Sequence, residues 1–83
     1  MLQKEITVKP TFGLYNNKVT YFVQKANEFK SSIWIQVEER KVNAKSLLGV
    51  VALGVDAGVR VDLIANGIDE EQAMEALNAI LSD

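Results

Sequence analysis

The feature that most constrains the fold is a repeated change in the spacing of apolar residues. Apolar and largely polar positions alternate in residues 2–8, 33–37 and 59–65, whereas apolar residues recur every three or four positions in residues 19–29 and 73–81. Alternation places apolar side chains on one face of a strand, and the longer spacing places them on one side of a helix. The chain therefore predicts interleaved strands and helices, each with one buried face.

Shorter elements fill the gaps between these segments. Pro10 ends the first strand because proline cannot donate to a sheet ladder, and residues 11–17 form a loop. A polar turn at residues 38–40 leads into a short strand at 41–43. Residues 47–53 are nearly all apolar and lie between Ser46 and Gly54, which favours a short helix. Their valines leave a buried strand open as the alternative.

The last helix carries its own start signal. Asp69 and Gln72 have the spacing of a capping box, and Glu70 and Glu71 suit the positive end of the helix dipole. The predicted order is β-α-β-β-α-β-α. The simplest architecture is an α+β sandwich, one domain over residues 1–83 with helices on one face of a small sheet.

The absence of two residue types restricts the chemistry. The 83 residues include no cysteine and no histidine, which excludes disulfides, thiolate nucleophiles, histidine-bound metals and phosphohistidine on this chain. The net charge of −2 argues against direct nucleic-acid binding. Residues 1–10 hold three charges and no apolar signal-peptide core, and no apolar run is long enough for a membrane span. We therefore expect a cytoplasmic protein that binds neither nucleic acid nor membrane.

Three weaker patterns have simple structural interpretations. Gly49 and Gly54 have the spacing of a phosphate-binding loop, but Val55 follows where that loop needs lysine, so the simpler interpretation is that Gly54 ends a helix and Gly58 forms a turn. The acidic residues 69–71 match the first turn of a helix, and we predict no metal site. Trp34 lies on the polar face of its strand, where a binding role stays open.

Ser46 carries the most information about function. As a helix N-cap its hydroxyl accepts a free backbone N–H group and stabilises the chain by about 1 kcal/mol. As a phosphoacceptor it would place about two negative charges beside the apolar residues Leu47, Leu48 and Val51. The residues alone favour the plain cap.

A resemblance to a known family changes this balance. Residues 42–54, with Lys45 and Ser46 followed by Leu47 and Leu48, resemble the regulatory-serine motif of the HPr family, the phosphocarriers of the bacterial sugar phosphotransferase system. Length, element order, the pair at 13–14 and Gly67 also fit, so the resemblance covers essentially the whole chain. It implies an HPr-like open-faced β-sandwich: a four-stranded antiparallel sheet with three helices on one face.

The chain departs from the family at the phosphocarrier site. Phosphocarriers have histidine, alanine, arginine and proline after a Gly-Leu pair, whereas this chain has Tyr15, Asn16, Asn17 and Lys18. Tyr15 thus occupies the phosphohistidine position, and a phenol ester has a far lower transfer potential than a phosphohistidine. The resemblance therefore implies a protein that is not a phosphocarrier or an enzyme, with no catalytic residue and no cofactor.

The pattern resembles the Crh-like branch of the family, which lacks the histidine and keeps the serine. It implies phosphorylation of Ser46 by an HPr kinase/phosphorylase, with Leu47, Leu48 and Val51 as a contact patch, Lys45 at its edge, and a CcpA-type transcriptional repressor as partner. Because that branch keeps the arginine and proline that this chain lacks, the downstream partner can differ. A residual role in phosphotransfer, or a constitutive scaffold in which Ser46 only caps a helix, stays open as an alternative.

Overall fold

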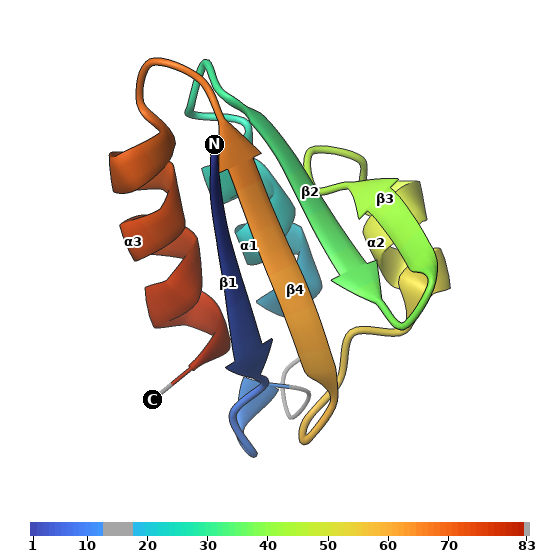
Figure 1. Ribbon diagram of the computed structural model, residues 1–83. Helices are drawn as coiled ribbons and strands as arrows, with labels where there is room; N and C mark the ends of the chain where they lie inside the picture. Colours follow the sequence, from blue (N-terminus) through green and yellow to red (C-terminus); the bar gives the residue numbers. More distant parts are fainter. Residues whose placement is uncertain (13–17, 83) are drawn as a thin grey trace.

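The chain folds into a four-stranded antiparallel sheet with helices on one face, as a computed structural model describing residues 1–12 and 18–82 shows (Figure 1). The elements in chain order are β1 (Leu2–Thr7), α1 (Lys18–Ala26), β2 (Ser32–Val37), β3 (Arg40–Asn43), α2 (Leu47–Leu53), β4 (Arg60–Asn66) and α3 (Glu70–Leu81). The predicted fold class and element order are confirmed. None of the helices formed by these residues is long and apolar enough to cross a membrane.

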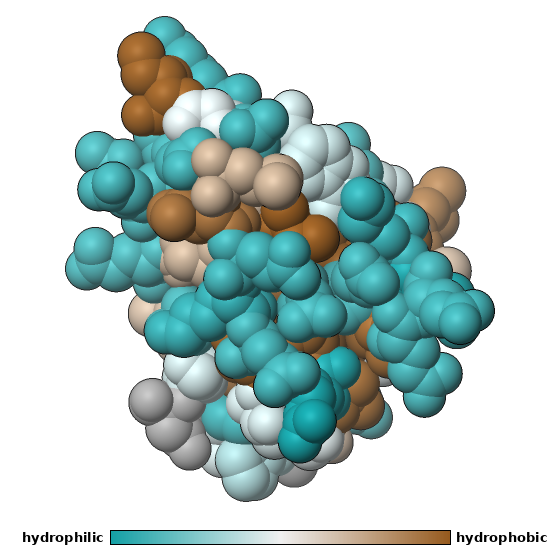
Figure 2. All heavy atoms as spheres, viewed as in Figure 1, coloured by the Kyte–Doolittle hydropathy of each residue, from teal (hydrophilic) through white to brown (hydrophobic). Residues whose placement is uncertain are grey.

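The sheet has the strand order β1-β4-β2-β3, so the last strand lies between the first two. In β4, Leu63 is paired with Lys4 of β1 on one side and with Ile35 of β2 on the other. Leu63 and Ile35 are fully buried beneath the helices, which is where alternation in each strand places the apolar core. The face of the sheet that no helix covers is mainly hydrophilic (Figure 2).

Two strand residues depart from simple alternation. Lys4 lies on the apolar face of β1 but stays exposed, because β1 is an edge strand. Ile64 lies on the open face of β4 and is nevertheless only 7% exposed. Its cross-strand neighbour in β2 is Trp34, which is itself partly buried. These two apolar side chains therefore form a small cluster on an otherwise hydrophilic surface.

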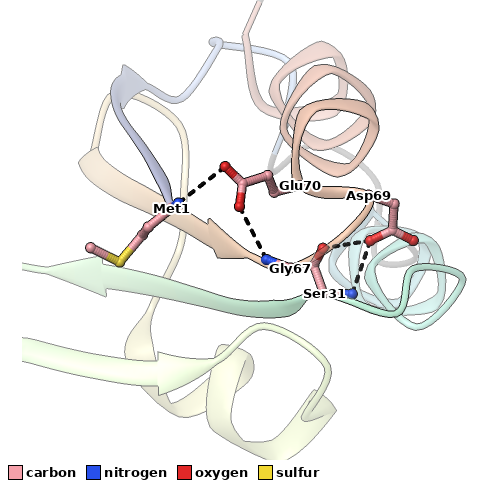
Figure 3. A network of polar contacts seen from close by, with 5 residues as sticks. All are labelled: Met1, Ser31, Gly67, Asp69 and Glu70. Carbon is pink, nitrogen blue, oxygen red and sulfur yellow. Dashed lines mark hydrogen bonds and ion pairs between the residues drawn. The ribbon is translucent and has the colours of Figure 1, made fainter.

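The predicted capping box at α3 is wrong. Asp69 occupies the N-cap position but makes no side-chain bond to its own helix. Its carboxylate instead accepts hydrogen bonds from the backbone N–H groups of Lys30 (2.8 Å) and Ser31 (2.9 Å) and from the Ser31 hydroxyl. Figure 3 shows the two bonds from Ser31. The Glu70 carboxylate accepts from the Gly67 N–H group and lies 3.1 Å from the terminal amino group of Met1. Asp69 is therefore a tether to the loop before β2.

This tether depends on a close approach of two backbones. A Cβ atom added to Gly67 would lie 2.6 Å from both Cα and Oγ of Ser31, closer than any side chain allows. Ser31 is 1% exposed, so it has no room to move away. The hydrogen bonds from the Ser31 hydroxyl and then from the Lys30 N–H group lower the pKa of Asp69 to about 2. The ionised carboxylate is thus the form that joins these loops.

Candidate functional site

Ser46 stands at the start of α2, as the sequence predicts. Its backbone is extended, with φ −101° and ψ 112°, and its Oγ accepts a hydrogen bond from the Gly49 N–H group at 3.1 Å. Its carbonyl oxygen accepts the first bond of the helix, from the Val50 N–H group at 3.0 Å. The capping role of Ser46 is confirmed, and the alternative of a buried strand at residues 47–53 is wrong.

The Ser46 hydroxyl remains available for chemistry while it caps the helix. Accepting one N–H group uses a single lone pair and leaves the hydroxyl proton for another partner. Ser46 is exposed, and a Cβ atom at Gly49 would lie only 3.3 Å from its Oγ. Gly49 therefore leaves the hydroxyl uncrowded on the side facing the helix.

The glycines of this segment serve the helix. Gly49 lies inside α2, and Gly54 is its C-cap in the left-handed conformation, with φ 81° and an N–H group that donates to the Val51 carbonyl. Because an L side chain is strained at this φ, glycine ends the helix here at little cost. Their spacing thus reflects a short helix, in agreement with the interpretation given to the weak phosphate-loop pattern.

Three apolar side chains of α2 face water beside Ser46. Leu47 is 43% exposed, Val51 is 59% exposed and Leu48 is 83% exposed. The opposite side of the helix packs into the core through Val50 and Leu53. Since Leu47, Leu48 and Val51 are not needed to cover the core, they form a surface suited to contact with another protein. We call these three residues the α2 patch.

Lys45, which the resemblance places at the edge of this patch, is bonded to the segment that follows α1. Its Nζ donates to the Phe29 carbonyl at 2.7 Å, and its backbone carbonyl accepts from the Asn27 side-chain amide at 3.1 Å. The same amide donates to the Val23 carbonyl near the end of α1 at 2.8 Å. Lys45 thus joins the entry of α2 to the exit of α1.

The sequence gives no sign of the roles of Asn27 and Arg40. The Arg40 guanidinium donates to the Ala52 carbonyl at 2.6 Å, so β3 satisfies one of the free carbonyl groups at the end of α2. Asn27 and Arg40 lie eighteen and twelve residues from their partners. Only the folded arrangement brings them together.

Tyr15 and Asn17, which the sequence places at the family's histidine and arginine positions, lie outside the described residues. Lys18, the next residue in that comparison, is the first residue of α1. Within the part of the chain that the structure describes, no group of three or more carboxylates could hold a metal ion. The candidate site that the structure describes consists of the Ser46 hydroxyl and the α2 patch.

Comparisons with known proteins place this geometry in context. The family model described as the PTS HPr component phosphorylation site matches residues 2–83. The chain is 43% identical over 81 residues to HPr-like protein Crh of Halalkalibacterium halodurans, covering 98% of this chain and 96% of the relative. It is 40% identical over 83 residues to HPr-like protein Crh of Bacillus subtilis, covering 100% and 98%. The crystal structure of a phosphocarrier protein HPr from Bacillus anthracis superposes with a TM-score of 0.91 at 36% identity, covering 98% and 96%.

Proposed function

This chain belongs to the HPr family, and we propose that it is a regulatory member that acts in catabolite control by binding other proteins. Two observations support a regulatory role over phosphotransfer. The sequence has no histidine, so a phosphohistidine relay has no acceptor on this chain. The two relatives described above are named HPr-like protein Crh, and the similarity spans nearly the whole of each.

We propose Ser46 as the switch. An HPr kinase/phosphorylase would transfer the γ-phosphoryl group of ATP to Ser46 Oγ, so that the bond to the β-phosphate oxygen breaks, ADP leaves and the hydroxyl proton passes to a base on the kinase. The exposed, uncrowded hydroxyl at the start of α2 is the observation that carries this proposal. The modification adds about two negative charges.

The α2 patch would be the surface that a partner contacts once Ser46 is phosphorylated. Its apolar area and the new charge lie next to each other in the chain, so one partner surface can contact both. A CcpA-type repressor is the partner that the resemblance implies. Because Asn17 stands where the family has arginine, and asparagine cannot form a bidentate contact with an anion, affinity for that repressor would be reduced.

Intact mass after incubation with an HPr kinase, ATP and magnesium tests the switch. Wild type should gain one phosphoryl group, and so should Ser32→Ala, in which another exposed serine is removed. Ser46→Asn should gain none. Asparagine is as good an N-cap as serine, so this variant keeps α2 while removing the acceptor. Modification of Ser46→Asn would contradict the assignment.

Calorimetry of phosphorylated and unmodified protein with a CcpA-type repressor tests the partner. We expect binding to the phosphorylated form only, and weaker binding after Val51→Ala. Equal binding of wild type and Ser46→Asn, with or without kinase treatment, would instead support a constitutive scaffold. The observed bond from Gly49 to Ser46 is all that such a scaffold requires of this serine.

A further inference from the structure

An open groove lies between α1 and α3, which pack side by side on the covered face of the sheet (Figure 1). Its volume is about 390 Å³. The apolar part of its lining comes from one aromatic residue of α1 and three aliphatic residues of α3: Tyr21, Ala76, Ala79 and Ile80. The charged part consists of lysines: Lys9, Lys18 and Lys25. The groove thus combines an apolar surface with positive charge.

The concentration of lysines in this groove is unusual for the chain. The sequence has nine basic and eleven acidic residues, yet three of the nine basic ones line this groove and none of its described lining residues is acidic. Lys25 pairs with Glu28 at 3.3 Å, and Glu28 is 60% exposed, so an incoming carboxylate can compete for this lysine. The local potential is therefore positive on an acidic protein, which favours an anionic ligand.

Both sides of the groove are held in place by the fold. The Lys9 N–H group donates to the Leu81 carbonyl at 2.7 Å, which fixes Lys9 against the last turn of α3. On the other side, α1 is anchored in the core by Phe22 and Val23. Tyr21 is 51% exposed and is not part of that core, so its ring remains available to contact a ligand.

We propose that this groove binds an acidic segment of a partner protein, with one apolar side chain of the segment between α1 and α3 and its carboxylates beside the lysines. The openness of the groove favours a chain segment over a small metabolite. Small-molecule sites enclose most of their ligand, whereas Tyr21 and Ala79 lie exposed here. Helix α1 packs against both α2 and α3, but no residue of α2 lines the groove, so binding there does not require Ser46.

The first test titrates the ¹⁵N-labelled full-length chain with the peptide acetyl-Glu-Glu-Phe-Glu-Glu-amide and follows backbone amide shifts. We expect saturable shifts at Tyr21, Lys25, Ala76 and Ile80. The peptide with glutamine in place of glutamate should bind at least about 10-fold more weakly, because Lys9 and Lys25 lose their charged partners on the peptide. The peptide with glycine in place of phenylalanine should also bind more weakly, since it loses the apolar contact.

Substitutions in the protein sharpen this test. Lys25→Glu should weaken peptide binding by about 5-fold or more, whereas Lys30→Glu, a matched charge reversal at a lysine that does not line the groove, should change it less than about 2-fold. Glu28→Gln should strengthen binding, because it removes the acid that competes for Lys25. A merely structural role for Lys25 would not produce this gain. Urea unfolding midpoints confirm that each variant is folded.

Four results would overturn the proposal. The first is no amide shift at millimolar peptide, and the second is shifts confined to the α2 patch. The third is an equal response at the groove to inorganic phosphate, which would make it a general anion site. The fourth is a groove signal that depends on protein concentration without peptide, which would assign the groove to a second copy of the chain.

Discussion

Helices α2 and α3 both begin after a residue suited to capping, Ser46 and Asp69, but these two side chains form different hydrogen bonds. Ser46 bonds within its own helix, to the Gly49 N–H group three residues on. Asp69 makes no bond to its helix and instead holds the loop at residues 30–31. An N-cap with one local bond can be modified without parting distant segments, whereas an N-cap that joins two loops cannot. This difference supports the proposal that the switch lies at the start of α2 and not at the start of α3.

The largest effect should come from removing the close approach at Gly67. Gly67→Ala places a Cβ atom 2.6 Å from the Ser31 backbone and pushes the Asp69 tether apart. We expect a loss of about 3 kcal/mol of unfolding free energy, measured by urea denaturation with Trp34 fluorescence. The matched variant Gly49→Ala has its nearest contact at 3.3 Å and should lose much less. Equal losses would mean that the two helix starts are equally constrained.

Asp69→Asn should lower stability less than Gly67→Ala, and in a pH-dependent way. The pKa of Asp69 is about 2, below its ordinary value of 3.8. The charged carboxylate therefore stabilises the folded state fully at pH values above its ordinary pKa. This contribution is lost as the pH falls from about 4 to about 2. The difference in unfolding free energy between wild type and Asp69→Asn should therefore be greatest near neutral pH and shrink over that range.

A control accompanies the pH measurement. The pKa of Glu70 is also lowered, because the Gly67 N–H group donates to it and the terminal amino group is close. Glu70 titrates in both proteins, so its contribution largely cancels in the difference. A difference that stays constant from neutral pH to about pH 2 would contradict the tether.

Ser46→Ala should have a smaller and purely local effect. It removes one cap bond, for an expected loss of about 1 kcal/mol, whereas Ser46→Asn should stay close to wild type. Amide shifts should change in α2 and not in residues 66–70. A loss as large as that of Gly67→Ala would show that Ser46 supports more of the fold than its one local bond.

Leu48→Ala should affect stability least. Its side chain is 83% exposed, so we expect a change within about 0.5 kcal/mol. The same substitution should weaken binding of a partner to the phosphorylated protein, measured by calorimetry, if the α2 patch is the contact surface. Unchanged binding together with unchanged stability would remove Leu48 from that surface.

The sequence predicts the elements well because each depends on local spacing. Alternation in residues 2–8 and 33–37 and the cap at Ser46 require only neighbouring residues, and the structure confirms those strands and that helix start. Asp69 shows the limit of local inference. It has the spacing of a capping box, but its carboxylate accepts hydrogen bonds from backbone N–H groups far away in the chain, those of Lys30 and Ser31.

In the candidate site, too, some features follow from the local sequence and others depend on how distant segments pack. The position of Ser46 at the start of α2 follows from the local sequence, whereas the almost continuous apolar run at residues 47–53 does not show which side of the helix faces water. The bond from Lys45 to the Phe29 carbonyl depends on how α1 and α2 pack, which no local pattern contains. The groove between α1 and α3 is a similar case, because Lys9 and Ile80 come from opposite ends of the chain.

The seven-residue length of α2 has a consequence for hydrogen exchange. The first helical bond runs from the Val50 N–H group to the Ser46 carbonyl oxygen, so three of the seven N–H groups of α2, those of Leu47, Leu48 and Gly49, have no acceptor within the helix. The capping hydrogen bonds at Ser46 and Gly54 therefore contribute a large share of the interactions that keep this short helix folded. We expect α2 amides to exchange with deuterium through local opening, well before those of β4, so that an enzyme meets residues 46–53 both open and closed while the sheet stays intact.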